Sequence, residues 1–518
     1  MTITTAKLPG KALRLTPLAL AALLVAAESH ADTTFTPTIG LAGTYSDNPT
    51  LLPSNQAQGQ FIIESVPAFT LRTRSRRLRL DVGADWHFYG YQDRDISNVR
   101  HRDRRYGGSG EAILIDDLLS VAASANGSSQ AVSAFGPQFG NQYSNTNRTD
   151  VRTWSVSPTL KHRFGSTADL TLVATRDGVE SDQVNAAYGD SQSTTAILNL
   201  SSGVRFTTLS WGLSYTRQAL DSRQLGSTTS QNANLSLRYR LSRTWSALAT
   251  AGYDDYEYLA LRDRTAGRSY TAGFSWTPTS RTSIEATFGH RYFGKTGSLA
   301  ATSRARHLVS RITYSDLVTT NRQQFLLPSA VSTSALLDQL FSSSIPDPAL
   351  RAEAVQAYIK ATGLPPSLAN DVNYLSNRYQ REKRLEAAYI VTMPHSSLVM
   401  SAYKSERIAL SSQQSDSQLL GSQFLALNDD VRQRGLNATF SYRLSPRTSA
   451  NASAWTNRAT SIATGIESPS KTLTLGLSRQ FDRKTRGSLE LRHNSSRFDV
   501  RGGEVTENAL MANLSVQL

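Results

Sequence analysis

The chain is 518 residues long, contains no cysteine and carries a formal net charge of +14. The lack of cysteine excludes a disulfide scaffold, cysteine-ligated metal sites and a lipid-modified N-terminal cysteine. Beyond the N-terminal segment there is no apolar run of about 18 residues, which excludes helical membrane spans.

The first residues are typical of a secretory signal peptide. A basic segment at residues 7–14 precedes an apolar core, Leu15–Ala27, that is shorter than the roughly 20 residues of a spanning helix. Small residues at Ser29 and Ala31 suit signal peptidase, so we expect residues 1–31 to be removed and the mature chain to begin near Asp32. Because the chain is then exported, we expect its positive charge to meet acidic lipid headgroups or an anionic polymer, and no nucleic acid.

Residues 235–253 show the pattern that recurs through the rest of the chain. Leu235–Leu241 and Trp245–Tyr253 each alternate apolar with polar residues, and a short turn at 242–244 joins them. Since successive strand side chains point to opposite faces, each arm has one apolar and one polar face. A soluble β-sandwich also alternates, but its strands are usually about 5–6 residues long, and these arms approach the length of a membrane-crossing strand. The same alternation appears at residues 78–88, 209–216, 436–444, 473–478 and 510–518.

Short polar reversals separate the alternating segments and set the expected strand number. Longer polar connections lie between them, at residues 46–58, 92–105, 127–149 and 411–429. Short turns on one side and long loops on the other are typical of a bacterial outer-membrane barrel, whereas a propeller blade packs four short strands into a similar period. Ten reversals predict an all-β transmembrane antiparallel β-barrel of about 22 strands, with 18–24 possible. The reversals are at residues 75–77, 115–117, 165–167, 206–208, 242–244, 278–280, 315–317, 394–396, 445–447 and 482–484.

One segment, residues 328–378, departs from the alternation and predicts a helical insertion. Asp347 is a good N-cap with Pro348 at the first helical position, apolar residues follow at helical spacing, and Gly363 ends the helix. Counting strands from a periplasmic N-terminus places the insertion on the extracellular side. It is expected to act as a plug or a lid, or to be a packing element without a gating role.

Sequence motifs for chemistry are weak. Gly289–Thr296 matches the phosphate-loop pattern by letter, but its intervening residues are bulky, the preceding residues alternate as a half-polar strand, and Gly297–Ala300 is expected to begin a loop rather than a helix. The eight histidines form no zinc-binding pair, and no Gly-x-Ser-x-Gly motif is present. We therefore predict no enzyme, no catalytic residue, no metal and no cofactor.

Charged residues at polar positions of the expected strands are the candidate functional residues, because those positions face the lumen of a barrel. Rings of arginine favour anions in a pore. The carboxylates could instead neutralise the arginines in lumenal ion pairs, and arginines near strand ends could bind lipopolysaccharide phosphates. The candidate lumen-lining residues are Arg79, Arg238, Arg240, Arg291, Arg311, Arg443, Arg492, Asp81, Asp85, Glu285 and Glu490.

Several local motifs resemble the outer-membrane proteins of the PEP-CTERM/exosortase system, which are encoded with exopolysaccharide genes. The resemblance spans most of the mature chain and is most specific in the insertion. It implies a β-barrel beside an exopolysaccharide assembly and export apparatus, and it brings no catalytic residues. One departure is the C-terminus, because such barrels usually end in an aromatic residue and this chain ends in Leu518. The motifs are Thr44–Asn48 with Pro53, Arg77–Leu80, Leu337–Phe341, Pro346–Pro348 and Tyr374–Arg378.

The expected function is therefore that of a conduit or accessory component for exopolysaccharide export in the outer membrane of a Gram-negative cell. Its expected partners are outer-membrane lipid, lipopolysaccharide, the exopolysaccharide and the envelope export machinery. A general diffusion porin is one alternative. A structural barrel that displays its loops without transport is another.

Overall fold

The computed structural model describes residues 32–136, 143–181, 190–222, 226–258, 265–326, 378–411, 427, 430–498 and 503–518. The expected signal peptide, residues 1–31, and almost all of the expected helical insertion lie outside the described residues. None of the helices in the described ranges is long and apolar enough to cross a membrane.

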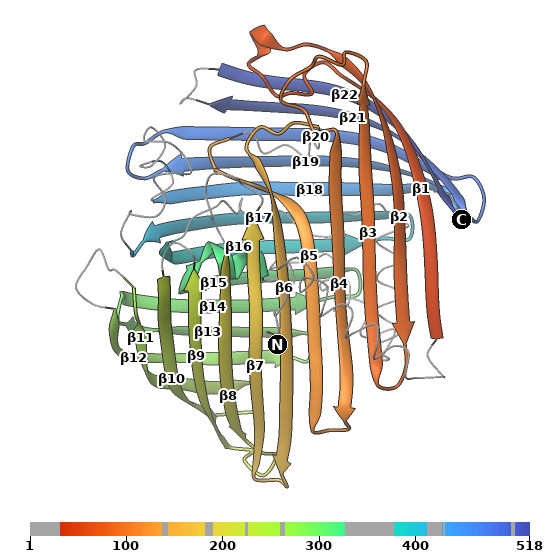
Figure 1. The fold of residues 1–518 in the computed structure, drawn as a ribbon. Coiled ribbons are helices and arrows are strands. Elements are labelled where there is room, and N and C mark those ends of the chain that lie inside the picture. The colour runs from red at the N-terminus through yellow and green to blue at the C-terminus, as the bar shows by residue number, and fades with distance from the viewer. Residues whose placement is uncertain are drawn as a thin grey trace, which may run out of the picture.

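The described chain forms a closed antiparallel barrel of 22 strands (Figure 1). Each strand pairs with its neighbours in sequence, and β1 (Asp32–Ser46) pairs with β22 (Gly503–Gln517) from Thr38↔Gln517 to Ser46↔Ala509. This last pairing leaves no free sheet edge, which is the condition for a sheet to be stable in hydrocarbon. The prediction of a barrel with about 22 strands is confirmed.

The strands are 10–17 residues long, which exceeds the usual strand of a soluble sheet. A short 3-10 turn, Ser54–Gln56, follows β1, and one short helix, α2 Asn321–Leu326, follows β15. The remaining strands are β2 Gln60–Arg74, β3 Leu78–Tyr91, β4 Arg102–Ile115, β5 Leu119–Ala131, β6 Arg148–Phe164, β7 Ala168–Ser181, β8 Ser191–Ser202, β9 Leu209–Ser222, β10 Gly226–Arg240, β11 Trp245–Tyr256, β12 Ala266–Thr279, β13 Thr282–Arg291, β14 Gly294–Arg304, β15 Leu308–Thr320, β16 Tyr379–Thr392, β17 Ser396–Ala409, β18 Val431–Ser445, β19 Thr448–Ser461, β20 Glu467–Gln480 and β21 Thr485–Phe498.

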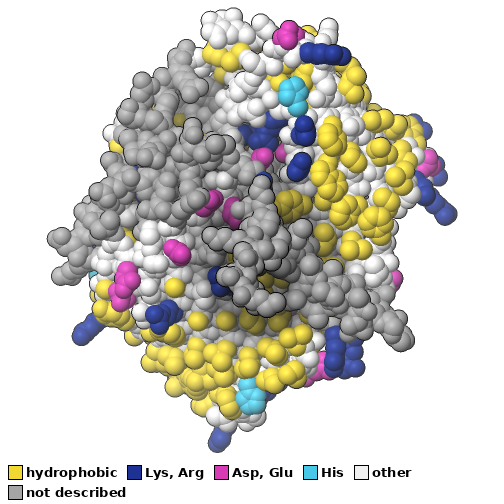
Figure 2. Space-filling view, in the orientation of Figure 1, with side chains coloured by type: hydrophobic (Ala, Val, Ile, Leu, Met, Phe, Trp, Pro, Cys, Tyr) yellow, Lys and Arg dark blue, Asp and Glu magenta, His cyan; other side chains and the backbone are white. Residues whose placement is uncertain are grey.

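The outer wall of the barrel is apolar. In the β10–β11 hairpin Leu235 lies opposite Ala251 and Tyr239 lies opposite Ala247, as the alternation predicts. Both Leu235 and Tyr239 are about half exposed, and the same holds for large apolar side chains around the circumference. Figure 2 shows these side chains in broad yellow patches with basic side chains along their borders. Such a surface is suited to contact with lipid, and the chain is an outer-membrane type of β-barrel.

Nine of the ten predicted reversals lie at or beside an observed turn, and one prediction was wrong. Residues 315–317 lie inside β15, and the chain reverses instead at residues 305–307. Serine and aspartate are typical of turns, but Asp316 accepts hydrogen bonds from Arg381 at 2.6 and 2.8 Å and so is satisfied within a strand. This ion pair with the neighbouring strand β16 satisfies the Asp316 carboxylate, so the residue is accommodated in a strand and not in the predicted turn.

Three predicted loops are also shorter than expected. The segment at 297–300 lies within β14, β4 begins at Arg102, and β5 and β6 extend to Ala131 and from Arg148. The phosphate-loop pattern at Gly289–Thr296 is thus the tight connection of the β13–β14 hairpin and has no following helix. Polar and glycine-rich composition misled the loop prediction, because lumen-facing strand positions accept the same residues.

Candidate functional site

The two ends of the barrel differ in the length of the connections between strands. The turns at residues 75–77, 165–167 and 482–484 share one end, and the long connections, including the one that holds α2, share the other. By the usual asymmetry of outer-membrane barrels, the short turns are periplasmic and the long connections extracellular. The candidate site is the lumen between these ends.

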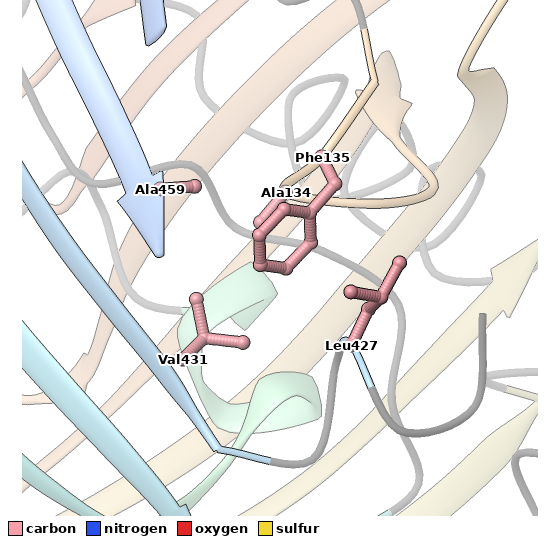
Figure 3. Close-up of a cluster of buried hydrophobic side chains, with 5 residues drawn as sticks. All are labelled: Ala134, Phe135, Leu427, Val431 and Ala459. Carbon is pink, nitrogen blue, oxygen red and sulfur yellow. The ribbon is translucent and has the colours of Figure 1, made fainter. Parts of the chain in front are cut away.

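A loop after β5 reaches across the extracellular mouth. Phe135 and Ala134 form a buried cluster with Val431 at the start of β18, Ala459 near the end of β19, and Leu427. Figure 3 shows these five side chains pointing toward one another. Because β5 and β18 are on opposite sides of the ring of paired strands, this cluster narrows the mouth.

The same loop packs against the inner wall of β1–β3. Tyr143 shares a 3.0 Å hydrogen bond with Thr44 and packs edge-on against Tyr89 at 5.4 Å. Burial raises the pKa of the Tyr143 phenol to about 12. Beneath it lies a pocket of about 270 Å³, whose lining includes Glu64, His87 and Arg492. This inner-wall pocket has a mixed acidic and basic lining, so it suits a polar solute or ordered water better than an apolar one.

Next to this pocket, Glu507 is fully buried at the β22–β1 seam. Its carboxylate accepts hydrogen bonds from Ser46 of β1 at 2.8 Å, Asn494 of β21 at 2.6 Å and Arg492 of β21 at 3.3 Å. A buried carboxylate is tolerated only when it is paired and hydrogen-bonded, and here those contacts connect three strands at the closure of the barrel.

Four tyrosines form an aromatic cluster on the opposite part of the mouth, here called the tyrosine cluster: Tyr256, Tyr258, Tyr292 and Tyr379. Tyr258 stacks on Tyr379 at 4.8 Å, and Tyr256 packs on Tyr292 at 5.3 Å. The Tyr379 hydroxyl shares a 3.1 Å hydrogen bond with Thr228 of β10. The hairpin of β13 and β14 has short strands of 10 and 11 residues, and the cluster covers the extracellular end of this hairpin.

The short helix α2 is tied to the far wall of the barrel. Arg322 forms a buried ion pair with Asp177 of β7 and donates to the Ser191 hydroxyl of β8 at 2.7 Å. Since α2 directly follows β15, this contact carries the chain across the mouth. α2 therefore lies inside the barrel opening, and the predicted insertion, residues 328–378, lies outside the described residues except for Arg378.

All eleven candidate residues lie at strand positions of the inward parity, opposite to the lipid-facing side chains. Several are engaged in ion pairs: Arg238–Glu285 at 2.7 Å, Arg291–Asp254 at 2.7 Å and Arg492–Glu507 at 3.3 Å. Asp81 pairs with Arg72 and Arg74, and Asp85 bonds His87 at 2.5 Å. Glu490 is half-buried on β21.

Four of the seven candidate arginines have no ion pair to any described residue: Arg79, Arg240, Arg311 and Arg443, here called the arginine ring. They lie on β3, β10, β15 and β18, each within the few residues nearest the periplasmic turns. Arg443 donates a hydrogen bond to the Pro394 carbonyl of the adjoining turn. The ring therefore places four arginines around the periplasmic end of the lumen, where Arg79 lies directly opposite Glu111 of β4.

Sequence reasoning named Glu285, which pairs with Arg238, but it missed Asp254, Asp177 and Glu507 and the tyrosine cluster. Asp254 and Asp177 lie on the polar parity of their strands, which was a usable signal. The contact of Tyr258 with Tyr379 joins residues more than a hundred positions apart, and no local pattern predicts it.

The barrel is similar in architecture to several solved structures. These include the FrpB iron transporter from Neisseria meningitidis (F5-1 variant), with a TM-score of 0.49 and 9% identity over 96% of this chain and 84% of that chain. The siderophore receptor PirA from Pseudomonas aeruginosa gives 0.44 and 11% over 93% and 80%, and PirA from Acinetobacter baumannii gives 0.48 and 8% over 95% and 81%. No protein-family model and no curated protein matches the sequence.

Proposed function

We propose that the barrel is an outer-membrane conduit for an acidic exopolysaccharide that leaves the periplasm. Under this proposal the chain is exported with a cleaved signal peptide and belongs with the outer-membrane proteins of the PEP-CTERM system. Its partners are then the exopolysaccharide and the envelope machinery that assembles it.

The arginine ring is the observation that carries the proposal. Arginine guanidinium groups bind carboxylates in a bidentate geometry, and rings of arginine favour anions in a pore. The ring lies at the end from which an exported polymer enters, and cationic walls raise the local concentration of an anionic substrate.

The mouth offers a second supporting feature. The rings of the tyrosine cluster combine an apolar face with a polar edge, which suits contact with a sugar ring and its hydroxyls. In the upper lumen, Arg291 and Arg492 are neutralised by ion pairs with Asp254 and Glu507. A polymer drawn in at the periplasmic end would not be held tightly at the exit.

The test compares the mature barrel with a fourfold variant, R79Q/R240Q/R311Q/R443Q, in planar bilayers and in cells. A matched control, R243Q/R281Q/R306Q/R483Q, removes the same charge from exposed periplasmic turns. We expect the ring variant to lose anion preference and at least about tenfold of the block by anionic oligosaccharide, because these charges face the pore. The control should keep both properties.

Two results would separate the other functions. Equal passage of neutral and anionic oligosaccharides through both variants indicates a general diffusion porin. Normal polysaccharide secretion by a clean deletion strain contradicts export and leaves a structural barrel.

A further inference from the structure

The extracellular edge of the apolar outer wall is marked by aromatic side chains on part of the barrel. Tyr45 and Phe61 on β1 and β2 are exposed there, as are Tyr253, Tyr270 and Phe288 on β11–β13. Such girdles lie at the level of the lipid headgroups. Over β17–β20 the described residues include no outward-facing aromatic at this level, and basic residues take their place.

Four basic residues stand at this level in place of aromatic ones. They are Lys404 of β17, Arg434 of β18, Arg458 of β19 and Lys471 of β20, here called the basic row. Lys404 lies directly opposite Arg434, and Arg434 directly opposite Arg458. Lys471 is opposite Thr456, one outward position closer to the apolar band. Directly opposed residues of neighbouring strands have Cα atoms about 4.5–5.5 Å apart, so three positive charges lie side by side. All four side chains are exposed.

The protein itself compensates little of this charge. Arg458 pairs with Glu467 at 3.3 Å. Glu406, the outward acid beyond Lys404, is paired with Arg432 at 3.3 Å. Lys404, like the two other members of the row, has no ion pair within the described part of the chain. Like charges directly opposite each other destabilise a sheet, so this arrangement needs an external anion.

The position of the basic row along the membrane normal indicates which anion it binds. On β18 the outward apolar residues run from Leu436 to Leu444, and Arg434 is the next outward residue above Leu436. Eight residues of strand rise about 26 Å, which is about 20 Å along the membrane normal at a tilt of about 40°. The row therefore lies just above the hydrocarbon of the outer leaflet, where the phosphates of lipopolysaccharide are found.

We propose that the basic row is a binding site for the phosphate groups of lipopolysaccharide on the outer face of β17–β20. Figure 1 shows these strands side by side, so the four residues lie on neighbouring strands of the barrel wall. Guanidinium and ammonium groups form charge-assisted hydrogen bonds with phosphate oxygens, and acyl chains of the same molecule cover the exposed leucines below. The site is on the opposite face of the wall from the lumen and does not depend on the proposed transport.

The test uses the mature barrel in detergent, with diphosphoryl lipid A, dephosphorylated lipid A and inorganic phosphate as probes. Binding is measured by native mass spectrometry for K404Q/R434Q/R458Q/K471Q and for the periplasmic-turn control R243Q/R281Q/R306Q/R483Q. We expect diphosphoryl lipid A to bind the row variant at least tenfold more weakly than the parent, and the control within twofold of it. Inorganic phosphate should bind far more weakly than lipid A in every case.

Three outcomes overturn the proposal: unchanged lipid A affinity in the row variant, equal affinity of the parent for dephosphorylated lipid A, and phosphate binding as strong as lipid A binding. The last would show a site for free anions. If the fourfold variant does not fold, the single variants K404Q and R434Q replace it. Each should weaken binding two- to fivefold, and no weakening in either would equally reject the site.

Discussion

At the residue scale, buried polar side chains fix the loops inside the barrel mouth. Tyr143 is nearly inaccessible, and its hydroxyl contacts Thr44 of the wall while its ring packs on Tyr89. The raised pKa of Tyr143, about 12, means that the folded loop favours the neutral phenol. A raised pKa of this kind contributes stability in full below the free phenol's pKa of about 10, and the contribution is lost as the pH rises toward 12.

We therefore predict that the loop around Tyr143 loosens only in strong alkali. A spectrophotometric titration at 295 nm should show that the parent has one more phenol ionising near pH 12 than Tyr143→Phe has. The substitution itself removes one hydrogen bond and should cost about 0.5–1.5 kcal/mol. If the additional phenol of the parent ionises near the free value of about 10 instead, Tyr143 is not buried as described.

At the element scale, the seam between β22 and β1 decides whether the sheet closes. The backbone pairing of the seam is shorter than that of β1 with β2, and Glu507 reinforces it through Ser46, Arg492 and Asn494. Removing one partner of a buried ion pair leaves an uncompensated charge, and this is more costly than the net gain from the pair.

The substitution Glu507→Ala should accordingly lower the free energy of unfolding by about 3–5 kcal/mol. Glu504 lies on the same strand but is exposed, so Glu504→Ala is the matched control and should change stability by at most about 0.5 kcal/mol. Urea unfolding in lipid vesicles measures both. Equal stability of the two variants would mean that Glu507 does not support the seam.

At the scale of the whole molecule, the barrel separates two solvents, with lipid outside and water within the lumen. Leu475 of β20 is 58% exposed on the outer wall, and its neighbour Thr474 is partly buried on the lumenal side. A cation on the outer wall would contact hydrocarbon, whereas one on the inner wall would contact water and polar groups.

We expect Leu475→Arg to destabilise the barrel by about 2–4 kcal/mol when it is folded in a bilayer, because the residue lies in the middle of its strand. Thr474→Arg should have a much smaller effect. Comparing denaturant midpoints for the two variants in vesicles checks the assignment of faces. A larger loss for Thr474→Arg would reverse the inside and outside of the wall.

The sequence alone determined the barrel, its approximate strand number and the faces of the strands with clear alternation, because alternation with a period of two and turn residues are local features of the chain. It failed at residues 315–317, where Asp316 is satisfied by an ion pair with Arg381 within a strand. It also failed at the loops around 92–105 and 127–149, where lumenal strand positions have the polar composition of loops. Tertiary structure alone decided which polar side chains lie together: Glu507 accepts a hydrogen bond from Ser46, Arg322 pairs with Asp177, and Lys404 lies opposite Arg434 in the β17–β18 register. These contacts depend on ring closure and strand register, which bring together residues whose separation in the chain carries no local signal.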